Sequence, residues 1–125
     1  MSVNNPVQTY KEIQIKTANQ IKLIVMLYDG AIRHLTQALD GFAEGHRRYD
    51  LINTHVIAAQ DIISELMASL DFDKGGQVAK NLFALYTYMN HQLLDANLKK
   101  DEKPVHEVKK MLSELREAWD EISTK

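Results

Sequence analysis

The chain has 125 residues, of which 45% are hydrophobic and 26% charged, and its formal net charge at neutral pH is -2. It contains no cysteine, which excludes disulfides and cysteine-ligated metal sites. Acidic and basic residues nearly balance. Binding to nucleic acid requires a clustered positive surface, so we expect no nucleic-acid partner. The sequence contains neither a secretory signal nor a run of about 18 apolar residues, so we expect a single cytoplasmic domain without membrane insertion.

The first 16 residues differ in character from the remainder of the chain. Asn4, Asn5 and Pro6 disfavour regular structure, yet Val7 and Tyr10 belong to a stretch that is too apolar for a free tail. We interpret residues 1–16 as a strap that lies on the domain and covers apolar surface. The alternative is a partly frayed terminus.

Residues 17–125 contain four segments with the periodicity of amphipathic helices. Apolar residues recur in steps of three and four along residues 24–42, 52–70, 78–96 and 105–122, the third series beginning at Val78. Thr17 with Gln20 predicts the start of the first helix as a capping box, and the pair Gly75–Gly76 can open the third. The connections are short, so neighbouring helices must be antiparallel, and we predict an all-α, up-down-up-down four-helix bundle.

No residue pattern requires catalysis, a cofactor or a metal. Di-iron bundles need Glu-x-x-His pairs, which are absent, and the five histidines include no pair at a separation of three or four. We therefore expect a protein that is not an enzyme. The alternative is a histidine phosphotransfer bundle with phosphate on His55, although the residues that follow it are apolar or Ala where that family usually has Lys and Gly.

Several apolar residues lie off the predicted seams. Ile57 of the second helix should be level with about Asn90 of the third, which would align these residues into a groove. A groove between helices suits an amphipathic partner helix, and the alternatives are occupation by the strap or a homodimer contact. The residues of the predicted groove are Ile57, Phe83, Leu94 and Leu98, with Ile21 and Val25 beside the seam of the first helix.

Several strings of this sequence resemble the flagellar secretion chaperone family, FliS. An N-terminal Asn5-Pro6 followed by Tyr10 is similar to that family's Asn-Pro-Tyr-x-x-Tyr, with Val7 where the family usually has Tyr. The longer matching strings are Met26–Ala31 (MLYDGA), Gly75–Leu82 (GGQVAKNL), Leu85–Met89 (LYTYM) and Leu115–Trp119 (LREAW).

The resemblance implies a cytosolic chaperone that binds the disordered C-terminal segment of flagellin. The client would form helices on the bundle's grooves, and this binding would prevent premature polymerisation. The client would then pass to the flagellar export apparatus for type III secretion. The resemblance also implies that the N-terminal segment, with Pro6, Val7 and Tyr10, is a removable plug. We expect a monomer or weak homodimer without a cofactor.

Overall fold

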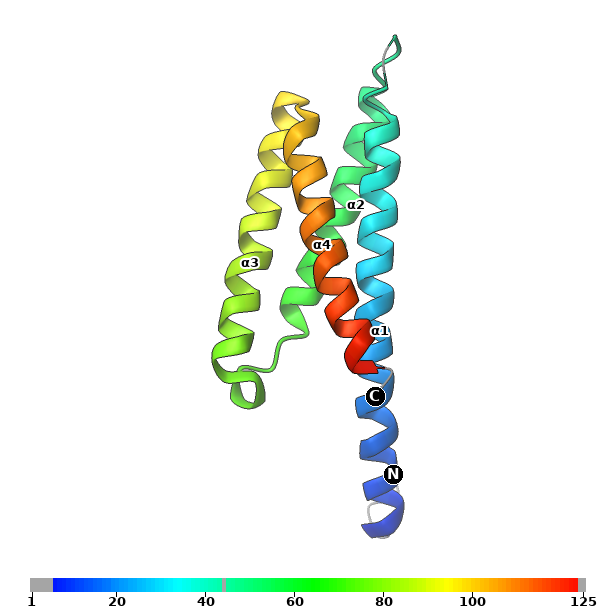
Figure 1. Cartoon of the computed structure of the whole chain (residues 1–125), viewed down its shortest axis with the longest axis vertical. Helices are drawn as coiled ribbons and strands as arrows, with labels where there is room; N and C mark the ends of the chain where they lie inside the picture. The colour runs from blue at the N-terminus through cyan, green and yellow to red at the C-terminus, as the bar shows by residue number, and fades with distance from the viewer. Residues whose placement is uncertain (1–5, 44, 124–125) are drawn as a thin grey trace.

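The structure, a computed structural model, is built from four helices (Figure 1). It describes the backbone of residues 6–43 and 45–123 and the side chains of 20–43 and 45–122. The helices are α1 (Pro6–Asp40), α2 (Tyr49–Ala68), α3 (Phe72–Lys99) and α4 (Glu102–Ser123). Both α1 and α3 pack against α2 and α4, and successive helices are antiparallel. The predicted four-helix bundle is thereby confirmed. Within the described ranges, no helix is long and apolar enough to cross a membrane.

The core is formed by one stripe of each helix. The stripes of α1 and α2 follow the predicted seams, as Leu35 and Ile63 illustrate, each with no exposed surface. The stripe of α4 follows its seam through Leu112 but not to the predicted end, where Ile122 exposes 53% of its surface. The stripe of α3 differs at its N-terminal end, because Ala79 and not Val78 is buried there. Val78 was wrongly predicted to belong to the core, since the helical repeat alone does not fix the rotation of α3 about its axis.

The start of α3 combines a capped first turn with a kink. The Asp71 carboxylate accepts hydrogen bonds from the backbone N–H groups of Asp73 and Lys74, at 3.1 and 3.0 Å. Gly76 then has φ 51° and ψ -124°, a conformation that side chains with a Cβ rarely adopt. The glycine pair therefore does not open the helix, which begins at Phe72, but it does mark where the regular part of α3 starts.

Helix α1 is longer than predicted. Its backbone is helical from Pro6 through the expected start at Thr17, and Figure 1 shows this N-terminal part extending beyond the ends of the other helices. No proline or glycine lies between Pro6 and Gly30, so nothing in the sequence ends the helix, and proline is well tolerated in a first turn. Residues 1–5 and the side chains of Pro6, Val7 and Tyr10 lie outside the described part, so their contact with the bundle stays a prediction.

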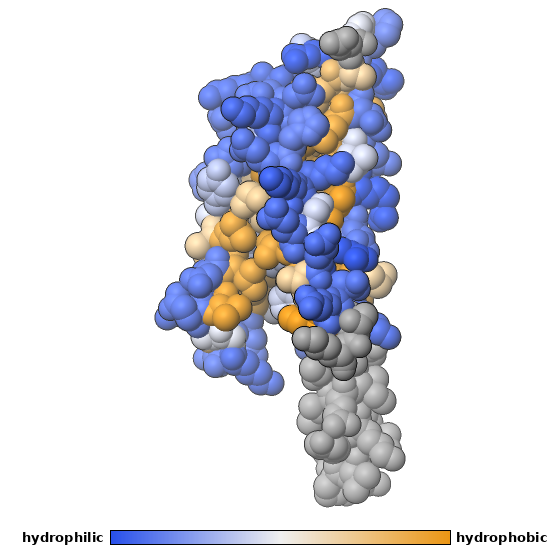
Figure 2. Space-filling model, viewed as in Figure 1, coloured by the Kyte–Doolittle hydropathy of each residue, from blue (hydrophilic) through white to orange (hydrophobic). Residues whose placement is uncertain are grey.

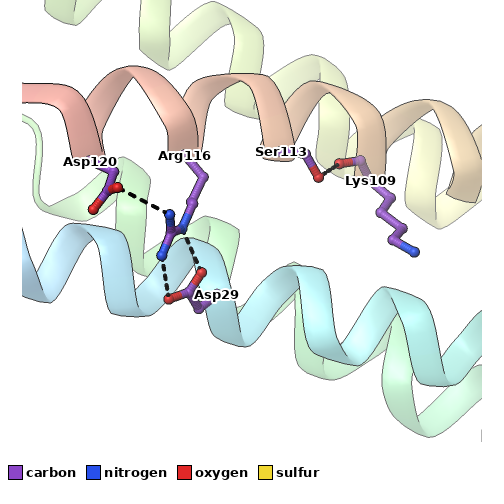
Figure 3. Close-up of polar contacts among 5 residues, drawn as sticks. All are labelled: Asp29, Lys109, Ser113, Arg116 and Asp120. Carbon is purple, nitrogen blue, oxygen red and sulfur yellow. Dashed lines mark hydrogen bonds and ion pairs between the residues drawn. The ribbon is translucent and has the colours of Figure 1, made fainter.

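One ion-pair cluster fixes α4 against α1 (Figure 3). Arg116 donates from Nε to Asp29 Oδ1 at 2.8 Å, and its Nη1 lies 3.4 Å from Asp120 Oδ2 on the same helix. The hydrogen bond to Asp29 raises the pKa of the Arg116 guanidinium. A half-exposed pair of this kind adds little stability, but its directed geometry sets the register of the two helices.

Candidate functional site

The four predicted groove residues of α2 and α3 are all exposed. Ile57 and Phe83 expose 43% of their surface, Leu94 50% and Leu98 76%. Such side chains are unremarkable singly, but a row of them along one pair of helices is a surface suited to binding an apolar partner. We call these four residues the α2–α3 face.

Polar contacts between α2 and α3 define their register. Asn97 Nδ2 donates to Asn53 Oδ1 at 2.8 Å, and Gln60 Nε2 donates to the backbone oxygen of Asn90 at 3.2 Å. Ile57 lies between these two contacts on α2. It is therefore level with a position on α3 about one turn beyond Asn90, so the predicted register was wrong by that turn.

The corrected register divides the α2–α3 face into two apolar parts. Ile57 is level with about Leu94, and Leu98 lies one turn further along α3. Phe83 is about 16 Å away along the helix axis, since each residue advances 1.5 Å. There it contacts Phe72, whose ring centroid is 5.9 Å away in an edge-on arrangement. Phe72 lies between the apolar series 52–70 and 78–96, so the periodicity did not identify it, although its half-exposed ring extends the face.

The two predicted residues of α1 are placed elsewhere. Val25 is buried, with only 8% of its surface exposed, and Ile21 is half-buried. The backbone of α1 lies close to those of α2 and α4, whereas α3 is diagonally opposite across the core, so neither residue joins the α2–α3 face.

An apolar cavity of about 250 Å³ lies at the end of the bundle where α3 and α4 diverge in Figure 1. Figure 2 shows a patch of apolar surface in the same lower part of the view, in addition to a narrower apolar strip nearer the top. A second, more polar hollow of about 520 Å³ shares Ile24 with it and continues along α1 from Gln20 to Leu27. Sequence reasoning assigned many of these residues to the core and could not show that the core is incompletely filled there. The apolar lining comprises Ile24, Leu66, Leu70, Val78, Ala79, Leu82, Tyr86 and Trp119.

One of two buried tyrosines that contact each other, Tyr86, lines this cavity. The hydroxyl of Tyr28 on α1 is hydrogen-bonded to that of Tyr86 on α3, and Tyr28 also has a hydrogen bond with Trp119 of α4. Burial raises the pKa of both phenols, so the hydroxyls remain protonated. The three residues join three helices at the point where the core ends.

The histidine of the alternative hypothesis is already engaged. His55 Nδ1 lies 3.0 Å from Nδ1 of His34 across the α1–α2 contact. This pair could not be predicted from the sequence, because the two residues are 21 positions apart on different helices. Among the described side chains, no group of three histidine, aspartate or glutamate residues could hold a metal ion.

Comparison with known proteins places this helical bundle in a family. The sequence profile described as Flagellar protein FliS matches residues 3–125. The chain is 39% identical over 124 residues to the flagellar secretion chaperone FliS of Salmonella typhimurium, which covers 94% of this chain and 87% of the relative. It is 34% identical over 119 residues to FliS of Vibrio cholerae, covering 92% and 86%, and 34% identical over 124 residues to FliS of Campylobacter jejuni, covering 98% and 94%.

A small all-helical bundle with an exposed apolar face has the features of a binding protein. The chain is a member of the FliS family of flagellar secretion chaperones, which are not enzymes.

Proposed function

We propose that this protein binds the C-terminal segment of flagellin in the cytoplasm and presents it to the flagellar export apparatus. Flagellin ends assemble by pairing amphipathic helices, so burial of their apolar faces on a separate bundle keeps the subunit from polymerising. The observation that carries this proposal is the α2–α3 face, whose apolar side chains Ile57, Phe83, Leu94 and Leu98 are exposed and have no partner helix among the described residues.

The dimensions of the face suit a helical client. Its two apolar parts are separated by about 16 Å, which is roughly three turns of helix. A client helix with apolar residues about eleven positions apart could therefore contact Leu94 and Phe83 together. Part of the interaction energy orders the disordered client, which lowers net affinity and makes release possible without nucleotide hydrolysis.

The α2–α3 face can be tested with the double variant Phe83→Asp/Leu94→Asp. Each buried apolar side chain contributes roughly 1.5–3 kcal/mol, so we expect the affinity for a flagellin C-terminal peptide to fall by about 100-fold or more in calorimetry. The circular dichroism spectrum should not change, because both side chains are half-exposed in the free protein.

Met26→Asp is the matched control for this experiment. Met26 is 64% exposed but lies on α1, away from α3, so the variant should bind the peptide normally. Normal binding by the Phe83→Asp/Leu94→Asp variant would contradict the assignment of the face.

Light scattering without peptide tests the remaining alternative, in which a second copy of this chain covers the same face; we expect a monomer.

The N-terminal segment is proposed to act as a removable plug of the bundle. Gln20, Leu23, Ile24 and Leu27 of α1 line the hollow at the open end, which supports the proposal because the N-terminal segment directly precedes them in the chain. Pro6, Val7 and Tyr10 would then cover apolar surface until the client displaces them.

A further inference from the structure

Two half-buried imidazoles meet across the contact between α1 and α2. The Nδ1 atoms of His34 and His55 are 3.0 Å apart, and the ring centroids are separated by 5.2 Å. At that distance one nitrogen must donate and the other accept, because a neutral imidazole carries one N–H and one lone pair. The contact therefore accommodates one proton between the two facing nitrogens. A second proton would place two N–H groups head to head.

Among the described residues, the charged groups that act on His34 do not compensate a second positive charge. Arg33 is the other charged group that acts on His34, and it has the same sign as a protonated imidazole. On α2, the residues one turn away on the side of His55 are Leu51, Ala58 and Ala59, which are uncharged. The carboxylate of Asp29, which precedes His34 on α1, is paired with the guanidinium of Arg116 of α4. Its negative charge is therefore already neutralised.

The helices cannot easily separate to relieve this repulsion. On one side of the pair, an added Cβ at Gly30 would lie 3.3 Å from Ile62 Cδ1. On the other side, an added Cβ at Gly41 would lie 2.8 Å from Ile52 Cγ1. Close packing on both sides thus holds the two rings together, so a change in their charge acts on the whole seam.

We propose that the His34–His55 pair is a proton-sensitive contact: it holds α1 against α2 while the two rings share one proton at their facing nitrogens, and it loosens this seam when both rings become protonated. The seam leads directly to the hollow lined by Leu27 of α1, so its loosening would also change the shape of the open end. This inference does not depend on the proposed function, since it concerns the free protein.

The direction of the pH dependence follows from His34. Burial, followed by the charges of His55 and Arg33, lowers the pKa of His34 below its ordinary value of about 6.5. The unfolded chain therefore binds more protons than the folded one as the pH falls below about 6.5. Stability is fully present above that pH, decreases below it, and levels off once His34 is protonated in the folded state as well.

Thermal unfolding of the full chain at pH 7.5 and 5.0 tests the proposal. All buffers should contain EDTA so that no trace metal bridges the rings. We expect the Tm of the wild type to fall between the two pH values by roughly 3–6 °C more than that of His34→Gln/His55→Gln. His91→Gln is the matched control, because His91 is an exposed histidine of α3, and it should retain the wild-type pH dependence.

An NMR titration of the wild-type histidine Hε1 signals provides a measurement that does not depend on whether the variants fold. We expect the His34 signal to titrate below the ordinary histidine range, and this titration to move to higher pH in His55→Gln. If the His34 titration is the same in His55→Gln as in the wild type, no proton is shared and the proposal is wrong. It is equally wrong if the double variant loses as much Tm on acidification as the wild type.

Discussion

The hydroxyls of Tyr28 and Tyr86 are polar groups buried in an otherwise apolar core. Neither residue exposes more than 1% of its surface, and each hydroxyl satisfies the other across the bundle. A buried hydroxyl without a partner costs more than the net gain of one hydrogen bond, so the two residues must be considered as a unit. Their pairing also specifies which face of α3 points inward, which explains why Tyr86 and not Leu85 occupies the core.

Loss of one hydroxyl leaves the other buried without a partner, whereas loss of both leaves neither unpaired. Each single variant should therefore cost more than half of the free energy of unfolding that the double variant costs. We expect Tyr86→Phe to lower the free energy of unfolding by about 1–3 kcal/mol, because the Tyr28 hydroxyl loses a partner. Tyr28→Phe/Tyr86→Phe should cost less than the sum of the single variants. Urea unfolding measures both values, and Tyr88→Phe, whose side chain is about half-exposed, is the matched control and should lie within about 0.5 kcal/mol of wild type.

The same pair gives a prediction for alkaline pH. Both phenols have a raised pKa in the folded protein, so stability is fully present below the ordinary tyrosine value of about 10 and is lost as the pH rises above it. The two hydroxyls are not coupled if the single variants lower the free energy of unfolding additively. The same conclusion follows if the double variant loses as much stability above about pH 10 as the wild type.

At the scale of elements, the contact between α1 and α2 depends on small residues. Gly41 follows the last residue of α1 and faces the start of α2 where the chain turns back. An added Cβ would meet Ile52 Cγ1 at 2.8 Å and the backbone oxygens of Ala38 and Arg48 at 3.1 and 3.2 Å. Backbone atoms cannot move aside as a flexible side chain can, so this connection requires glycine.

Gly41→Ala should therefore destabilise the bundle by about 1–3 kcal/mol, as other substitutions that overfill a packed site do. Gly30→Ala is the comparison within the same seam. Its Cβ would approach Ile62 Cδ1 at 3.3 Å, and the gain in helix propensity of about 1 kcal/mol offsets this contact, so we expect little net change. Chemical unfolding measures both. Equal effects of the two substitutions would argue against a backbone clash at Gly41.

At the scale of the whole molecule, the bundle is unevenly closed. The end that contains the connection between α3 and α4 is filled by residues such as Val105 and Leu93, whereas the opposite end contains the apolar cavity beside Trp119. Helix α1 extends beyond the bundle at this open end (Figure 1). The plug proposed for residues 1–16 and the cavity thus belong to the same region of the molecule.

Deletion of residues 1–16 should accelerate client binding if this segment competes with the client. The association rate with a flagellin C-terminal peptide, followed by stopped flow, should rise because no plug has to leave first. Trp119 is the sole tryptophan of the sequence and lines the cavity, so its emission should shift to longer wavelength when the cover is removed. Substitution of Val7 and Tyr10 by Ser in the full chain should have the same effect. An unchanged rate and an unchanged emission spectrum would contradict the plug.

The sequence by itself determined the four helices, their antiparallel order and the membership of the FliS family. It did so because the period of apolar residues and the short connections are local properties, and because the matching strings occur in order along nearly the whole chain. It also identified the exposed residues Ile57, Phe83, Leu94 and Leu98 as surplus to the core. The identification of these four residues required only the geometry of a single helix.

Only the tertiary structure decided how the helices face one another. The burial of Val25, the position of Ile57 level with about Leu94, the pairing of His34 with His55 and the cavity beside Trp119 all depend on the rotation and axial register of neighbouring helices. The periodicity of apolar residues does not fix the rotation or the axial register of a helix to better than about one turn. A stripe of apolar residues packs almost equally well after a small rotation or shift. The length, composition and balanced charge excluded several classes of protein, and contacts between residues far apart in the chain then decided which apolar side chains remained at the surface.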